Sequence, residues 1–263
     1  MTRPSRNERF LIRQFLVKKT LPFGGAFFLH VSKMPIFYIY SINVFVLTPN
    51  NLPLPKPTYM MKKVIAFVIG LATWYAVVAQ YFLMLDDRAV DIPETTIRFF
   101  SYFTILTNIL VAVYFTAIVI QGNSRNRLFS GPGSLTAITG YITVVGLIYQ
   151  IALRSLWQPE GQQWLVDELL HTVIPIAVIF FWYFYESSFP IRFQQIGTWL
   201  IYPVVYLIFI LIRGHFSNFY PYPFVNAPQL GLARVILTSG FLVILYILIS
   251  VLYIWLHTRA TKK

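Results

Sequence analysis

Six long stretches of mostly apolar residues fill the chain after its first 60 residues. A helix needs about 20 such residues to cross a bilayer, and the stretches run over Val64–Leu85, Ile97–Ile120, Ser134–Leu156, Leu169–Tyr185, Gln194–Ile212 and Leu232–Leu256. Apolar and polar residues do not alternate within them, which excludes a transmembrane β-barrel. The connections between them are too short to hold a soluble domain. The pattern therefore predicts an all-α integral membrane protein, built as a bundle of six transmembrane helices.

Composition strengthens this prediction and removes several other classes of protein. Charged residues make up 11% of the 263 residues and hydrophobic residues 57%, whereas soluble domains carry about 25% charged residues. The chain has no cysteine, so a disulfide framework, a cysteine metal site and a cysteine nucleophile are excluded. The net charge of +12 comes from lysines and arginines scattered between apolar runs, so no nucleic-acid partner is predicted. The expected partners are membrane lipids.

The first 60 residues differ from the rest. Residues 1–20 are basic and polar, residues 21–48 mix apolar runs with Gly24, Gly25, Lys33 and Pro35, and residues 49–58 are a Pro-rich linker. Met60-Met61-Lys62-Lys63 then precedes the first span, as at a natural protein start. Residues 1–60 are either a true extension or the product of an upstream start codon, and we favour the second. The predicted division is an extension at 1–60 and a six-helix transmembrane domain at 61–263.

Charge predicts the orientation, because cytoplasmic loops are rich in Lys and Arg. Of the 21 basic residues, 16 lie in the N-terminal region, in residues 121–133, in residues 186–193 and in the C-terminal tail, and five lie in the other connections. Seven of the nine acidic residues fall on the side that is poor in basic residues. Both termini are therefore expected in the cytoplasm, with the protein in the cytoplasmic membrane.

Polar side chains inside the second and fourth spans are functional candidates, because burying them in a membrane is costly. On the second span, Ser101, Thr104 and Asn108 share one helical face at about 100° per residue. On the fourth, Glu168 and His171 share a face with Pro175, which has no N–H for the His171 carbonyl and should kink the helix there. Thr104 and His171 are expected at similar depth near the outer leaflet, in one polar pocket.

The fifth span adds a third group of polar residues. Tyr202, Tyr206 and Arg213 share a face, and Pro203 should loosen the turn at Trp199. Each candidate also has a structural alternative. A threonine in a span usually bonds its own helix backbone, tyrosines often only pack, and an arginine at a helix end can be an interfacial anchor. The aromatic segment 220–224 is expected to lie flat on the membrane surface.

Several short motifs resemble known membrane protein families. The segments Phe100–Asn108, Leu170–Pro175, Tyr202–Gly214 and Tyr220–Phe224, in this order, resemble the bacterial six-pass family labelled Pr-six-Pr, over about residues 61–260. More distantly, Tyr102-Phe103-Thr104 and His171-Thr172-x-x-Pro175 resemble the androgen-induced and androgen-dependent TFPI-regulating proteins. Those proteins are intramembrane hydrolases that use a threonine nucleophile and a histidine on fatty-acid esters of hydroxy fatty acids. The Tyr-Pro-Tyr-Pro loop is not theirs, which leaves the substrate open.

Two classes of function follow. In the first, implied by the resemblance, Thr104 is the nucleophile and His171 the base of an intramembrane hydrolase of fatty-acyl esters, the logic of covalent catalysis. Glu168 would orient His171, Asn108 or Arg213 would stabilise the oxyanion, and Tyr202 and Tyr206 would line the pocket. In the second, the protein is a non-enzymatic transporter, lipid-binding scaffold or sensor. No metal or organic cofactor is predicted for either.

Overall fold

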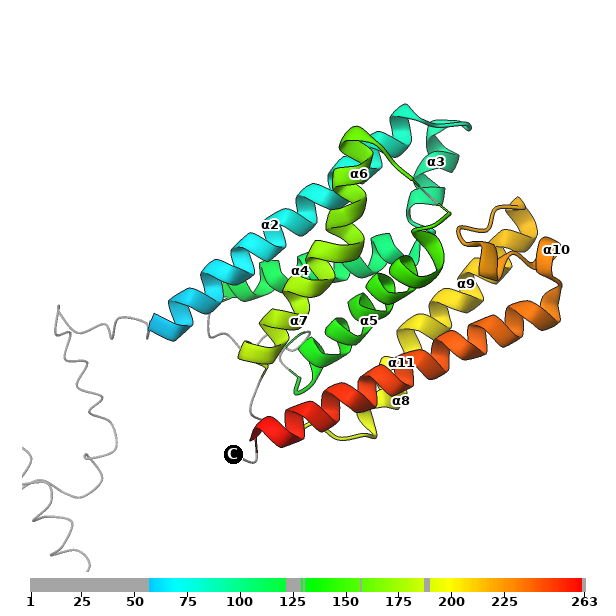
Figure 1. Cartoon of the computed structure of the whole chain (residues 1–263). Coiled ribbons are helices and arrows are strands. Elements are labelled where there is room, and N and C mark those ends of the chain that lie inside the picture. Colours follow the sequence, from blue (N-terminus) through cyan, green and yellow to red (C-terminus); the bar gives the residue numbers. More distant parts are fainter. Residues whose placement is uncertain (1–56, 122–128, 130, 157, 187–189, 262–263) are drawn as a thin grey trace, which may run out of the picture. The chain divides into compact units, whose positions relative to one another are not determined.

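The computed structural model describes residues 57–121, 129, 131–156, 158–186 and 190–261 of the chain. In this part it shows six helical segments long and apolar enough to cross a membrane: Met60–Asp86, Phe103–Ile120, Ser134–Leu153, Gly161–Tyr185, Gln195–Ser217 and Leu232–Thr261 (Figure 1). The predicted all-helical class and the six apolar helices are confirmed. Orientation in the membrane stays a prediction.

The described elements are all helical and follow one another along the chain. They are α2 (Pro57–Asp86), α3 (Ile92–Phe99), α4 (Phe103–Gln121), α5 (Ser134–Ile148), η2 (Tyr149–Leu153), α6 (Gly161–Glu168), η3 (Leu169–Val173), α7 (Ile174–Tyr185), α8 (Gln195–Trp199), α9 (Ile201–Ser217), η4 (Pro223–Val225), α10 (Ala227–Leu230) and α11 (Leu232–Thr261). The predicted extension lies outside the described residues up to position 56. Residues 57–60 belong to α2, since a proline fits the first turn of a helix.

The second predicted span begins too early. Residues 97–99 belong to the separate helix α3, whose N-cap Asp91 accepts a hydrogen bond from the Glu94 N–H, and the spanning helix α4 starts only at Phe103. Between the two helices Ser101 is fully buried, and its hydroxyl donates to the Ile97 carbonyl. The expected common face of Ser101, Thr104 and Asn108 is therefore wrong, because a capped helix and a turn interrupt the register.

Prolines interrupt two spans where the sequence predicts weak points. The fourth span has a π-helical turn, η3, directly before α7, and Pro175 lies in the first turn of α7. The fifth span is interrupted at Leu200, between α8 and α9, where Pro203 leaves the Trp199 carbonyl without its helical donor. The Tyr141 hydroxyl donates to that carbonyl at 2.6 Å. A side chain from α5 therefore satisfies the group that the proline releases.

Helix α5 is the best-buried span of the bundle, with contacts to α4, α7 and α11. It approaches the fourth span closely at Gly146, where an added Cβ would lie 3.1 Å from the His171 carbonyl oxygen and 3.3 Å from the Pro175 Cβ. Helix α2 packs against α4 and α7 on the other side of the core. Most apolar side chains of α9 point outward instead, as expected of a helix facing lipid.

Candidate functional site

Two cavities meet inside the bundle. The first, which we call the polar chamber, has a volume of about 550 Å³, opens to the surface, and is lined by the end of α2, by α3, the start of α4, η2, α6, η3 and residues 219–223. The second, which we call the apolar slot, has a volume of about 100 Å³ and lies between α4, α5, α9 and α11. Thr104, Leu153 and Tyr222 line both. These three residues therefore form the boundary between a polar and an apolar compartment.

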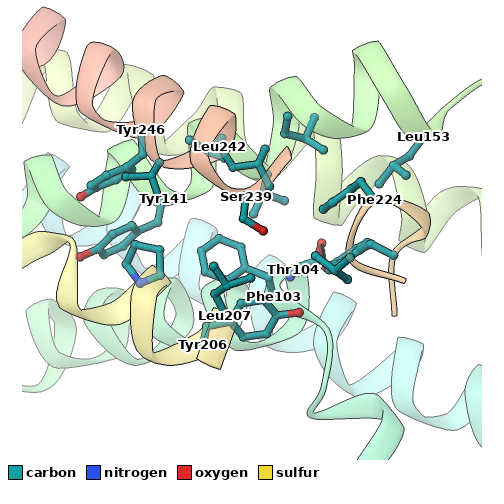
Figure 2. A pocket seen from close by; sticks show the side chains of 17 residues that line it. Phe103, Thr104, Tyr141, Leu153, Tyr206, Leu207, Phe224, Ser239, Leu242 and Tyr246 are labelled. Carbon is teal, nitrogen blue, oxygen red and sulfur yellow. Dashed lines mark hydrogen bonds between the residues drawn. The ribbon is translucent and has the colours of Figure 1, made fainter. Parts of the chain in front are cut away.

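The apolar slot has a nearly continuous hydrocarbon wall. In Figure 2, Tyr141 and Tyr246 stand at one end of the slot, Leu153 and Phe224 at the other, and Ser239 between them. The Ser239 side chain is buried, and among the described residues its hydroxyl has no hydrogen-bond partner. The remaining lining residues are valine, leucine, isoleucine, proline and aromatic side chains, together with Thr104. Such a wall suits hydrocarbon, and the slot volume of about 100 Å³, below the ~300–1,000 Å³ of most ligand pockets, holds only a short stretch of an alkyl chain.

Thr104 lies in the first turn of α4, and its partner is a tyrosine from a distant loop. The Thr104 N–H donates to the Tyr222 hydroxyl oxygen at 3.2 Å, and the Thr104 Oγ1 lies 3.3 Å from the same oxygen. Both residues are buried. The hydroxyl of Thr104 thus bonds across the structure rather than to its own helix, unlike most threonines in spans.

His171 lines the polar chamber from η3, and Asp167 orients it. Its Nδ1 lies 2.9 Å from the Asp167 carbonyl oxygen and 3.3 Å from the Asp167 Oδ1, and its ring stacks on Tyr149 at 4.2 Å. Both Asp167 atoms are acceptors, so Nδ1 carries the proton of the neutral ring, and the lone pair is on Nε2. The Tyr149 hydroxyl donates to the other oxygen of the Asp167 carboxylate. These contacts fix the ring plane and the tautomer.

The predicted orienting residue, Glu168, is wrong. Glu168 forms an ion pair with Arg154 and makes no contact of that kind with His171 within the described residues. The spacing accounts for this, because residues four apart on a helix lie on nearly the same face, and the π turn at Leu169–Val173, with more than four residues per turn, favours that spacing further. On such a helix, residues four positions apart lie on nearly the same face, whereas residues three positions apart point in clearly different directions. Asp167, four residues before His171, therefore meets the imidazole.

Asn108 is a structural link. Its Nδ2 donates to the Thr104 carbonyl at 2.9 Å and to the Leu170 carbonyl at 3.4 Å, and it lines neither cavity. It joins the first turn of α4 to the fourth span beside the π turn. Because Asn108 does not face either cavity, its side chain is not placed for the donation to an oxyanion that the sequence analysis predicts.

The two tyrosines of α9 differ in their positions. The Tyr206 hydroxyl donates to the Ser101 carbonyl at 2.8 Å, and its ring lines the apolar slot. The Tyr202 hydroxyl lies 3.0 Å from the Thr107 Oγ1, and its ring stacks on Phe103, outside both cavities. Only Tyr206 therefore lies where the sequence analysis expects a pocket residue.

Arg213 ties α9 to α3, away from both cavities. Its guanidinium lies 2.8 Å from the Glu94 Oε1, which also pairs with Arg98 at 2.9 Å. The hydrogen bond from Arg98, followed by that from Arg213, lowers the pKa of Glu94 below its ordinary value. The predicted oxyanion role of Arg213 is therefore not supported. Arg98 and Arg88, which are not among the predicted site residues, line the polar chamber instead.

The polar chamber is lined by both Thr104 and His171, and no hydrogen bond joins the two in the described part of the chain. The hydroxyl pairs with Tyr222 and the imidazole with Asp167. In the same part of the chain, no group of three histidines or carboxylates is arranged to hold a metal ion. Comparisons with protein-family models, with curated proteins and with solved structures gave no match to this chain.

The sequence analysis misses three site residues. Asp167 could have been found, since i,i+4 neighbours on a helix meet as readily as i,i+3 neighbours. Tyr149 lies in the third span, and Tyr222 lies in a loop 118 positions after Thr104. Neither has a local pattern that points to the partner it contacts. The aromatic segment that was expected to lie flat on the membrane instead turns Tyr222 into the bundle.

Proposed function

We propose that this multipass membrane protein hydrolyses fatty-acyl esters of lipids, with Thr104 as nucleophile and His171 as general base. The observation that carries the proposal is the position of Thr104 at the boundary of the two cavities. An alkyl chain in the apolar slot would place an ester carbonyl near the Thr104 hydroxyl, and the leaving alcohol and water would occupy the polar chamber. The likeness of the Tyr-Phe-Thr and His-Thr-x-x-Pro segments to intramembrane threonine hydrolases supports the same assignment.

The proposed reaction has two halves. The Thr104 Oγ1 attacks the acyl carbon as its proton passes to the His171 Nε2, directly after a side-chain rotation or through one water. The carbon–oxygen bond to the alcohol then breaks, and the alcohol takes the proton from His171. In the second half, water gives a proton to His171 as its oxygen attacks the acyl-threonine. The bond between the acyl carbon and the Thr104 Oγ1 then breaks, Oγ1 takes the proton back from His171, and the fatty acid is released.

Asp167 and Tyr149 support the base in this scheme. Asp167 holds the proton on Nδ1 and stabilises the imidazolium that forms when Nε2 takes a second proton. Stacking on Tyr149 limits rotation of the ring. The positioned pair of a histidine and a carboxylate is the part of a nucleophile–base–orienter arrangement that the resting structure already holds.

A second candidate function is lipid binding without chemistry. It is favoured by the resting hydrogen bonds, in which Thr104 pairs with Tyr222 and His171 pairs with Asp167. In that case the slot would hold an acyl chain, and the hydroxyls would bind its polar end.

Labelling with a fluorophosphonate probe, run beside hydrolysis assays on lipid esters of several acyl lengths, separates the two candidates. We expect purified wild-type protein to take the label and hydrolyse ester, and Thr104→Ala and His171→Ala to lose both. Asp167→Asn should lower kcat, since it removes the carboxylate charge that stabilises the imidazolium while the Asp167 main-chain carbonyl still holds the Nδ1 proton, whereas the matched carboxylate variant Glu168→Gln should retain most activity. Wild-type protein that binds lipid but neither takes label nor hydrolyses ester would favour the binding function.

A further inference from the structure

Tyr222 reaches the nucleophile from outside the transmembrane helices. It lies between α9 and α10, yet only 9% of its surface is exposed. Its ring stacks on Phe224 at 5.1 Å and packs edge-on against Tyr102 at 5.7 Å. The Thr238 hydroxyl donates to the Phe224 carbonyl and anchors the segment on α11. These contacts hold the Tyr222 hydroxyl in a fixed place at the start of α4.

The direction of the hydrogen bonds leaves the phenol proton available. A backbone N–H can only donate, so the Tyr222 oxygen is the acceptor of the bond from Thr104. At rest, the phenol proton can be donated to the Thr104 Oγ1, 3.3 Å away. Thr104 lies in the first turn of a 19-residue helix, where N–H groups have no intrahelical acceptor and the local potential is positive. A donor to the phenol oxygen polarises its O–H and makes it a stronger donor in turn.

The protonation state of Tyr222 fits a donor and excludes a base. Burial raises the pKa of Tyr222 to about 12, and the hydrogen bonds from Thr104 act against a further rise. The phenol of Tyr102 also acts on it, and burial raises the pKa of that phenol as well. At neutral pH both phenols are therefore neutral, and Tyr222 can only give a hydrogen bond to an anion.

We propose that the Tyr222 hydroxyl is the oxyanion donor of the Thr104 reaction. This inference rests on the proposed hydrolase function. When the Thr104 Oγ1 bonds to the acyl carbon, the electron pair of the carbonyl bond moves to the carbonyl oxygen. That oxygen is attached to the same carbon as Oγ1, so it forms within reach of the donor that already faces Oγ1. The Tyr222 proton turns from Oγ1 to the new oxyanion without being transferred, and turns back when the intermediate collapses.

Kinetics of Tyr222→Phe test this role. Loss of one oxyanion donor lowers kcat by about 10²–10³-fold, and KM should stay within about twofold, because the donor acts in the transition state. A trifluoromethyl ketone that mimics the tetrahedral intermediate should lose affinity by a similar factor, and the product fatty acid should not. The matched control is Tyr253→Phe, which removes another buried tyrosine–threonine hydrogen bond, to Thr143 at 2.8 Å, and should leave kcat unchanged.

A second variant keeps the contacts and changes only the acidity of the phenol. A ring-fluorinated tyrosine at position 222 lowers the phenol pKa, so activity should be lost at lower pH than in the wild type, because the phenolate cannot donate. A residue that merely anchors the loop would not move this alkaline limb.

The outcomes distinguish this inference from the function on which it rests. An active wild type, an inactive Thr104→Ala and a Tyr222→Phe variant with wild-type kcat would overturn the role of Tyr222 alone. An unmoved alkaline limb in the fluorinated protein would do the same. A wild type that hydrolyses no ester would overturn both proposals together.

Discussion

Gly214 is the position at which a single methyl group tests the link between the Tyr222 loop and the reaction. It is buried in α9, and a Cβ added there would lie 2.2 Å from the Cε1, 2.5 Å from the Cζ and 2.6 Å from the Cδ1 of the Tyr220 ring. Carbon atoms pack at about 3.5–4.0 Å, so the ring must withdraw by more than about 1 Å. Tyr220 is two residues before Tyr222, and the same loop carries both.

The magnitude follows from two opposing contributions. Overpacking of this kind costs about 1–3 kcal/mol, whereas replacing a helical glycine with alanine contributes up to about 1 kcal/mol in favour of folding. Gly214→Ala should therefore lower the free energy of unfolding by up to about 2 kcal/mol. Its larger effect should be on kcat, because misplacing a catalytic group by about 1 Å can cost about 10²-fold.

The assay compares Gly214→Ala with Gly240→Ala in the same detergent. Gly240 is exposed on α11, and its added Cβ would meet no atom within 4 Å. Thermal unfolding followed by circular dichroism gives the stability of each variant, and ester hydrolysis gives kcat. Equal stability and equal kcat in the two variants would refute the reasoning, since it would show that Tyr220 yields without moving Tyr222.

Two further predictions concern charge. The pKa of Glu94 is lowered in the folded state, so its contribution to stability is present above the ordinary carboxyl pKa of about 4.3 and is lost as pH falls through the lowered value. The melting temperature of the wild type should therefore drop on acidification below about pH 4. Glu94→Gln, which breaks the pair with the buried Arg213, should have a lower melting temperature at neutral pH and a smaller drop on acidification. An equal drop in the two proteins would contradict this. For orientation, the chain has no cysteine, so Ala89→Cys should react with an impermeant maleimide from outside intact cells and Thr261→Cys only after lysis. The reverse pattern would overturn the prediction that both termini are cytoplasmic.

The sequence alone predicts the six spanning helices well because the membrane imposes a local rule. A segment of about 20 apolar residues has to satisfy its backbone internally, and a helix does so with its own residues. The effects of Pro175 and Pro203 are equally local, since a missing N–H alters the turn just before it wherever the helix packs. Thr104 and His171 both line the polar chamber, and their predicted depth near the outer leaflet stays a prediction.

Local rules fail where a turn changes the register or a distant segment supplies the partner. A break at residues 100–102 separates α3 from α4, and the i,i+4 spacing places Asp167 rather than Glu168 beside His171. The sequence around Tyr222 predicts an aromatic residue at the membrane interface. Nothing in that sequence indicates that the Tyr220 ring packs against Gly214, which allows the loop to turn inward. Apolar length determined the helices of this protein, and only tertiary packing decided which polar groups meet at Thr104.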